Sequence, residues 1–311
     1  MKAKTGIRAG LLRSPLEELR YNRLYYLMAL IPLGFLFVFS YVPMYGLVMA
    51  FQRFSPGLGF ARSPWVGLEN YKFIFSLPDI QRVVWNTLII AVQKILFRQL
   101  AAILFAVLLN ELGARFLKRA VQTISYLPHF LSWVILGGAF VALLSRTGPI
   151  NRIIEALGGE AIFFLGSNAW FRPTIILTDV WQNFGFSSIV YLAALTSIDP
   201  GLYESAVIDG ANRLQQIFYI TLPGIATTIV LLAVLALGGV LSAGFEQILV
   251  LYNPAVYQTG DVIDTWIYRY GLQEARYSIA TAVGLFKSAI GCSLVFISKS
   301  LAKRFANYQV F

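Results

Sequence analysis

Polar side chains stand inside two long apolar runs of this sequence. Asp179 and Asn183 lie in the run 170–195, and Glu246 lies in the run 224–251. An ionisable group at the centre of a membrane costs about 2.5 to 3.5 kcal/mol, so such groups either line a water-filled path or pair with one another. Residues that line a path could hydrogen-bond the hydroxyl groups of a solute or stack on the face of its ring. Residues that are packed in the bundle instead hydrogen-bond from one helix to another. The candidates for a lined path are Asp179, Trp181, Gln182, Asn183, Glu246, Gln247 and Arg98.

Two basic residues share one face of a third apolar run. Lys94 and Arg98 are four residues apart within the run 83–110, so in a helix they lie one turn apart on the same side. Asp179 and Glu246 are their possible partners inside a helix bundle. Alternatively, these two side chains reach toward the membrane edge or bind an acidic solute.

The sequence lacks the constellations that carry catalysis or hold a metal. His129 is the only histidine and Cys292 the only cysteine, so no zinc motif can form from them. The phosphate-binding pattern Gly-x4-Gly-Lys-Ser/Thr is absent, because Lys287-Ser288 and Lys299-Ser300 lack the preceding glycines. We therefore predict no catalytic residue, no bound metal and no cofactor on this chain, and any ATP and Mg²⁺ must act on a partner.

The composition predicts that lipid surrounds these residues. Hydrophobic residues make up 58% of the 311, charged residues only 13%, and the mean hydropathy is +0.68, whereas soluble domains are about a quarter charged. Each long apolar run can cross a bilayer as a helix of about 20 residues. We predict an all-α, polytopic membrane protein with six spans, over 24–51, 83–110, 121–144, 170–195, 224–251 and 277–301.

Charge indicates the orientation of these spans. The net charge of +10 is concentrated on the side that holds the segment 1–23, the turn 111–120 and the tail 303–311. By the positive-inside rule, both termini are predicted to be cytoplasmic, with the membrane domain over 24–302. The charge is thus explained without a nucleic-acid partner. The run 24–51 is too long for the core of a signal peptide, so we expect it to be retained.

The inner connector 196–223 contains the strongest local signals. Asp199-Pro200 is typical of a helix N-cap followed by proline at the first helical position, and Gly210 can end that helix. A second short helix is predicted to run to Leu222-Pro223. This connector is therefore predicted to be a helical elbow on the cytoplasmic side, between the fourth and fifth spans. The outer connectors 52–82, 145–169 and 252–276 are rich in glycine, proline and aromatic residues, which is typical of a docking surface or an interfacial aromatic belt.

The elbow resembles the cytoplasmic signature of permease subunits of binding-protein-dependent ABC importers. That signature is Glu-Ala-Ala, three residues, Gly, nine residues, Ile, one residue and Leu-Pro. The chain matches it in spacing and in every fixed residue except one, where Ser205 replaces alanine. The residues that the resemblance assigns to ATPase coupling, together with two polar neighbours in the same helix, are Glu204, Ser205, Ala206, Asp209, Gly210, Ile220, Leu222 and Pro223.

Further segments are similar to the carbohydrate-uptake branch of that family, among them Leu109-Asn110-Glu111 and the stretch 261–265. The resemblance implies the type I importer permease fold and a bacterial cytoplasmic membrane. It also implies a second, homologous permease as a heterodimer partner, a pair of ABC ATPase subunits and an extracytoplasmic solute-binding protein. Its implied function is one half of an oligosaccharide translocation path.

Two other functions remain open at this point. A secondary transporter or channel for a polar solute would carry its determinants in broken helices and would need no ATPase-docking elbow. An importer of the same family for a solute other than sugar would have the same elbow, and only the carbohydrate-branch segments argue against it.

Overall fold

The computed structural model describes residues 21–305, and every regular element within that range is a helix. This confirms the all-α prediction. Most of the predicted N-terminal segment 1–23 and of the tail 303–311 lies outside the described residues. The α-helices are α2 (Arg23–Leu36), α3 (Gly59–Arg62), α4 (Glu69–Ser76), α5 (Pro78–Glu111), α6 (Arg115–Tyr126), α7 (Trp133–Leu144), α8 (Pro149–Ala156), α9 (Asn168–Leu195), α10 (Pro200–Ile208), α11 (Arg213–Gln216), α12 (Leu222–Gly224), α13 (Ala226–Leu237), α14 (Phe245–Leu251), α15 (Tyr257–Gly260), α16 (Ile263–Tyr268) and α17 (Tyr277–Phe305).

Four stretches of these helices are long and apolar enough to cross a membrane, and a bent pair makes up to five. The four are Arg23–Phe51, Pro78–Glu111, Trp133–Ala156 and Tyr277–Ser300. The helix α9 has 28 residues and coincides with the predicted fourth span, but its internal polar residues make it less apolar than these four. The count of six spans therefore stays a prediction.

Two of the predicted runs are broken helices rather than continuous ones. The run 121–144 divides into α6 and α7 at a 3₁₀ turn, Leu127–Phe130, which contains Pro128. The run 224–251 divides into α13 and α14 at residues 238–244, where Gly244 takes a left-handed conformation with φ 88°. Proline removes a hydrogen-bond donor and glycine tolerates positive φ, so both breaks have local causes.

The helices α5 and α9 form the centre of the bundle, packed side by side over much of their length. Ile90 of α5 and Ile175 of α9 are both fully buried in one apolar cluster that also takes in Ile248 of α14. On its other side, α9 approaches α6 so closely that a Cβ at Gly185 would collide with the carbonyl of Ser125. The centre of the bundle is thus a rigid frame onto which the broken helices pack.

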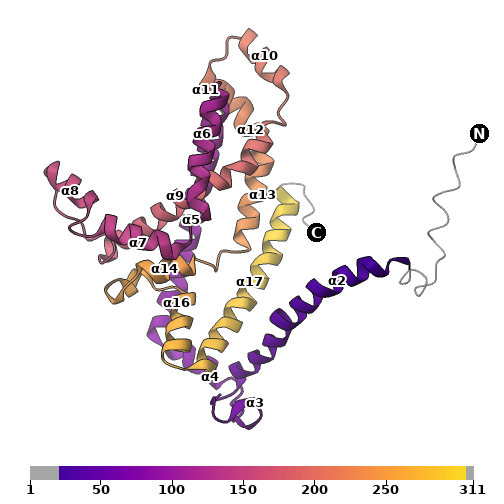
Figure 1. Ribbon diagram of the computed structural model, residues 1–311, viewed down its shortest axis with the longest axis vertical. Coiled ribbons are helices and arrows are strands. Elements are labelled where there is room, and N and C mark those ends of the chain that lie inside the picture. The colour runs from indigo at the N-terminus through magenta and orange to yellow at the C-terminus, as the bar shows by residue number, and fades with distance from the viewer. Residues whose placement is uncertain (1–20, 306–311) are drawn as a thin grey trace, which may run out of the picture.

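The first span departs from the bundle, as Figure 1 shows for α2. Its helix continues from α2 through a π-helical turn, Phe37–Tyr41, and a 3₁₀ stretch, Val42–Phe51. Only that last stretch packs against α17, and Ala50 is the only buried residue of Arg23–Phe51. Within the described part of the chain, this apolar span is therefore exposed over residues 23–41 and packs only over Val42–Phe51.

Candidate functional site

Asp179 stands between the two predicted cations in the centre of the bundle. Its Oδ1 lies 3.7 Å from Nζ of Lys94 and its Oδ2 lies 3.9 Å from Nη1 of Arg98. The pairing of the α5 cations with an acid is thus confirmed, and Asp179 rather than Glu246 is the partner. The two cations differ in exposure, because the Lys94 side chain is 5% exposed and that of Arg98 is 36% exposed.

Lys94 makes its shorter contacts with the broken fifth span. Its ammonium donates to the carbonyl of Ala243 at 2.7 Å and to Oε1 of Gln247. The amide of Gln247 in turn donates to the carbonyl of Ile175 at 2.7 Å and to Oγ1 of Thr178 at 2.8 Å. Gln247 is fully buried, and its side chain is hydrogen-bonded to Lys94 of α5 and to Ile175 and Thr178 of α9. It joins α5, α9 and α14, while its predicted role in a path stays a prediction.

A second polar group lies beside the break between α6 and α7. The amide of Gln182 donates to the carbonyl of Leu131 at 3.0 Å, which the helix break leaves without a helical partner. The amide of Asn183 donates to the carbonyl of Asp179 at 2.9 Å. Its Oδ1 lies 2.9 Å from Nδ1 of His129. The structure therefore gathers Gln182 and Asn183 on the side of α9 that faces α6.

His129 is a site residue that the sequence reasoning missed, because it was weighed only as a metal ligand. Its ring stacks on Phe186 with the centroids 4.0 Å apart, so it has a polar edge on Asn183 and an apolar face on a phenyl ring. The signal in the sequence was its neighbour Pro128. A proline in an apolar run marks a break, and breaks in membrane helices gather polar groups.

Trp181 and Glu246 are not part of these two groups. Trp181 packs edge-on against Phe140 and lines an apolar cavity of about 530 Å³ between α7 and α9. Glu246 is exposed in the first turn of α14. Of the seven candidate path residues, the structure thus brings together Asp179, Gln182, Asn183, Gln247 and Arg98.

The predicted elbow contains α10, which lies at one extreme of the molecule in Figure 1. The helix begins where predicted, since Oδ1 of Asp199 accepts from the amide of Gly201 at 2.9 Å. It ends before Gly210, whose φ is 80°. The hydroxyl groups of Tyr203 and Thr221 lie 3.0 Å apart, and their hydrogen bond joins α10 to the π-helical turn Ile217–Thr221.

The predicted coupling residues of α10 lie on a surface that the described chain leaves largely exposed. Glu204, Ser205, Asp209 and Gly210 are all exposed, and no residue of α10 is buried. Ser205 is occupied within its own helix, because its hydroxyl donates to the carbonyl of Gly201 at 2.9 Å. Ile220, Leu222 and Pro223 lie on the π-helical turn and α12 that follow. An exposed helix with acidic and apolar side chains is suited to contact another protein.

An ion pair fixes the outer connector between α14 and α17. Nη2 of Arg269 lies 2.6 Å from Oδ2 of Asp261, and its guanidinium covers the ring of Tyr257 at 4.3 Å. Burial alone would lower the pKa of Arg269, but the hydrogen bonds to Asp261 raise it above its ordinary value. Burial also raises the pKa of Tyr252 to about 12, with Tyr257 and Asp261 adding to the shift. Both side chains thus keep one protonation state at neutral pH.

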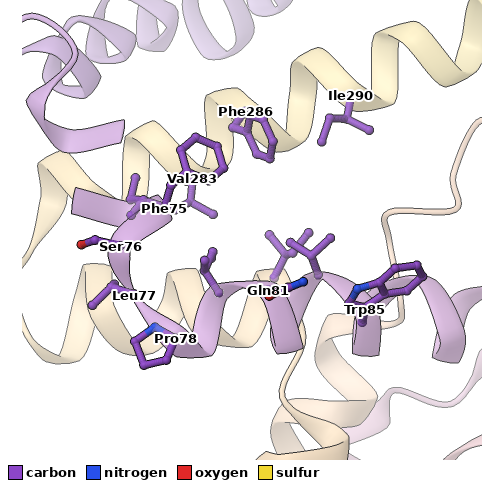
Figure 2. A pocket seen from close by; sticks show the side chains of 13 residues that line it. Phe75, Ser76, Leu77, Pro78, Gln81, Trp85, Val283, Phe286 and Ile290 are labelled. Atoms are coloured by element: carbon purple, nitrogen blue, oxygen red, sulfur yellow. The ribbon is translucent and has the colours of Figure 1, made fainter. Parts of the chain in front are cut away.

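A second cavity lined mostly by apolar residues lies away from the polar groups. It has a volume of about 440 Å³ and lies where the end of α4 and the start of α5 face α17, as Figure 2 shows. Its labelled lining includes Phe75, Trp85 and Phe286, while Ser76 and Gln81 supply the polar side chains. Such a lining suits acyl chains or apolar side chains better than a solute rich in hydroxyl groups.

Comparisons with known proteins give concordant matches. The sequence profile of the family described as "Binding-protein-dependent transport system inner membrane component" matches residues 99–307. The chain is 40% identical to "Protein LplB" of Bacillus subtilis strain 168, over 95% of this chain and 93% of that protein. It is 42% identical to the "Polygalacturonan/rhamnogalacturonan transport system permease protein YteP" of the same organism, over 95% and 92%.

Two solved structures share the fold. One is a crystal structure of a bacterial ABC transporter involved in the import of the acidic polysaccharide alginate, with a TM-score of 0.85, 42% identity and coverage of 93% of this chain and 98% of that chain. The other is the bacterial alginate ABC transporter in complex with a periplasmic protein bound to alginate pentasaccharide. Its TM-score is 0.86, with 40% identity and coverage of 96% and 100%.

Proposed function

This chain belongs to the family of binding-protein-dependent transport system inner membrane components, and we propose that it is the permease subunit of an ATP-driven oligosaccharide importer. The observation that carries this proposal is the match to the alginate transporter, which combines 42% identity with a TM-score of 0.85 over 93% of this chain. The chain would form one half of the translocation path. It would lie in a bacterial cytoplasmic membrane with both termini on the cytoplasmic side.

The proposed cargo is an oligosaccharide that carries carboxylate groups. Of the relatives, one is involved in the import of the acidic polysaccharide alginate and another is a transport system permease for polygalacturonan or rhamnogalacturonan. The polar centre of this chain supports the same class, because Lys94 and Arg98 share the single carboxylate of Asp179. The excess positive charge and the partial exposure of Arg98 suit a path that admits an anion.

The proposed partners are those that the importer architecture requires. A solute-binding protein would deliver the cargo at the outer connectors, as the complex of the alginate transporter with its periplasmic protein suggests. A second, homologous permease would complete the path. A pair of ABC ATPase subunits would hold ATP and Mg²⁺ and receive the exposed α10, with Glu204 and Asp209 as acceptors for basic side chains.

Reconstitution of the whole complex in vesicles tests this function. We expect uptake of labelled uronate oligosaccharides when ATP is trapped at the ATPase side and a loaded binding protein is present on the other side. Neutral oligosaccharides of the same length serve as the control for charge. Uptake driven by an ion gradient without ATP would contradict the proposal and favour a secondary transporter.

A further inference from the structure

The break in the fifth span places irregular backbone inside the bundle. Residues 238–244 separate α13 from α14, and Ala243 within them is 1% exposed. A helix break in lipid or protein leaves carbonyl groups that must find donors elsewhere, because water is excluded there. The donor for the carbonyl of Ala243 is Lys94, a residue that lies far away in the sequence.

Lys94 is bound to this break more closely than to its acid. Its Nζ lies 2.7 Å from the carbonyl of Ala243 but 3.7 Å from Oδ1 of Asp179. Its third partner, Gln247, is in the first turn of α14 and is itself held by α9. The ammonium group has three protons, and these three groups occupy its surroundings. Two neutral oxygens of the broken span, the carbonyl of Ala243 and Oε1 of Gln247, therefore lie closer to the ammonium than the carboxylate of Asp179 does.

Gly244 provides a second, independent observation at the same place. Its φ of 88° belongs to the left-handed region, which side chains other than glycine disfavour. A Cβ built on Gly244 would lie 2.6 Å from Nζ of Lys94. The ammonium group thus occupies the space that a side chain at position 244 would fill, so the two residues fit each other.

We propose that Lys94 is a positioning residue for the break between α13 and α14, which holds the non-helical segment 238–244 in place through the carbonyl of Ala243 and Oε1 of Gln247. The packed pair of α5 and α9 provides the rigid support, and the ammonium group connects that support to the break. Ser242 is exposed on the same segment, so the segment reaches the protein surface. This inference goes beyond the proposed function, because it requires no particular cargo and no nucleotide.

The alternative is that Lys94 serves only to neutralise Asp179. A double variant separates the two roles. Lys94→Met removes the ammonium group and leaves Asp179 with Arg98 alone, while Lys94→Met with Asp179→Asn removes the ammonium and the carboxylate together and keeps the parental net charge of the group. If Lys94 only balances charge, the double variant behaves like the parent; if Lys94 holds the carbonyl of Ala243, the double variant behaves like Lys94→Met.

The readout is the rate at which a cysteine at the break reacts with a maleimide in the purified, assembled complex. The parent carries Cys292→Ser and Val240→Cys, because Val240 lies in the break and is only 5% exposed, and Ser197→Cys at an exposed residue just after α9 is the control position. We expect Lys94→Met to raise the labelling rate at position 240 by on the order of tenfold, as the loss of a charge-assisted hydrogen bond does to an opening equilibrium. Position 197 should react at the parental rate.

Gly244→Ala disrupts the same contact by changing the break instead of Lys94. It therefore tests the proposal even if the complex with Lys94→Met does not assemble. Its methyl group would displace the ammonium from the break and would also strain the backbone at φ 88°, so faster labelling at position 240 is expected again. Adding Lys94→Met to Gly244→Ala should raise the rate no further if the displaced ammonium is the cause. A parental rate in either single variant, or a return to the parental rate in the double variant of Lys94 and Asp179, would overturn the proposal. Because labelling needs neither ATP nor sugar, its failure would leave the importer function untouched.

Discussion

Two cations on one helix face have different environments, although they share one acid. Lys94 is enclosed by protein groups, whereas the side chain of Arg98 is 36% exposed and reaches Asp179 only at 3.9 Å. Arg98 also lines a cavity of about 270 Å³, in which Gln99 and Ser187 add polar side chains to a mostly apolar lining. Of the two, Arg98 is the one placed to meet a solute.

Neutralising Arg98 should therefore affect acidic cargo selectively. We expect Arg98→Gln to reduce the uptake of uronate oligosaccharides by on the order of tenfold, because one interaction with a carboxylate is lost. Uptake of neutral oligosaccharides by the same vesicles should change little. Arg98→Lys, which keeps the charge, is the matched control. Equal losses for acidic and neutral cargo would assign Arg98 to the bundle rather than to cargo selection.

Gly210 ends α10 in a conformation that other residues adopt at a cost. Its φ is 80°, and no heavy atom lies within 4 Å of a Cβ built there, so the cost is conformational rather than steric. A non-glycine residue in this region loses roughly 1 to 2 kcal/mol. Gly210→Asp also adds a negative charge next to Asp209. The exposed end of the helix should change its shape and its charge together.

We expect Gly210→Asp to reduce co-purification of the ATPase subunits with this chain, because α10 is their proposed docking element. Binding of sugar to the solute-binding protein should be unchanged. Gly57→Asp, at an exposed and equally open glycine of the outer connector, is the matched control. If both variants retain the ATPase subunits and their coupled activity, α10 is not the docking element.

At the scale of elements, the contact between α9 and α6 is sensitive to volume. Gly185 faces the carbonyl of Ser125, which is main chain and cannot rotate away. We expect Gly185→Leu to destabilise the chain by about 1 to 3 kcal/mol, as overpacking does in cores. Gly138→Leu in α7 is the control, because a Cβ there meets nothing within 4 Å. A thermal unfolding midpoint in nanodiscs measures both, and equal midpoints would contradict this view of the contact.

The sequence predicts elements better than it predicts the contacts between their breaks. The ends of α9 and α17 lie within a few residues of the predicted spans, because long apolar runs identify membrane helices directly. Charge and helical spacing give the pairing of Lys94 and Arg98 with an acid as one of several alternatives, and only the structure selects Asp179 over Glu246. The hydrogen bond from Lys94 to Ala243 does not follow, because it joins a side chain to a backbone group that is free only when the fifth span is broken.

The sequence also does not predict which neighbouring helix a given side chain of a membrane helix faces. Trp181 and Gln182 are adjacent and both were predicted path residues, yet Gln182 reaches the break near Leu131 and Trp181 faces Phe140. A membrane helix can be apolar on all sides, so periodicity does not tell which side meets the path. His129 was missed for a related reason, since its partner Asn183 comes from another helix.

At the scale of the molecule, the described chain does not enclose a path. The polar groups lie on the frame of α5 and α9, while the apolar cavities open between α7 and α9 and between α4 and α17. The break at residues 238–244 packs into this frame through Val240, Leu241 and Ala243, while Ser242 is exposed. This is the arrangement expected of one half of a path, in which a second subunit covers the open side.

The separation of α2 from the bundle has a consequence for how the cell makes this protein. The part of this span before Val42 buries none of its residues, so it must enter the bilayer on hydrophobicity alone, and Arg23–Phe51 has a mean hydropathy of 2.0 over its best window. After insertion, lipid tails can cover this apolar surface as well as another helix can. The helix can therefore enter the membrane before the proposed second permease is present, and it keeps an apolar face on which that subunit could later pack.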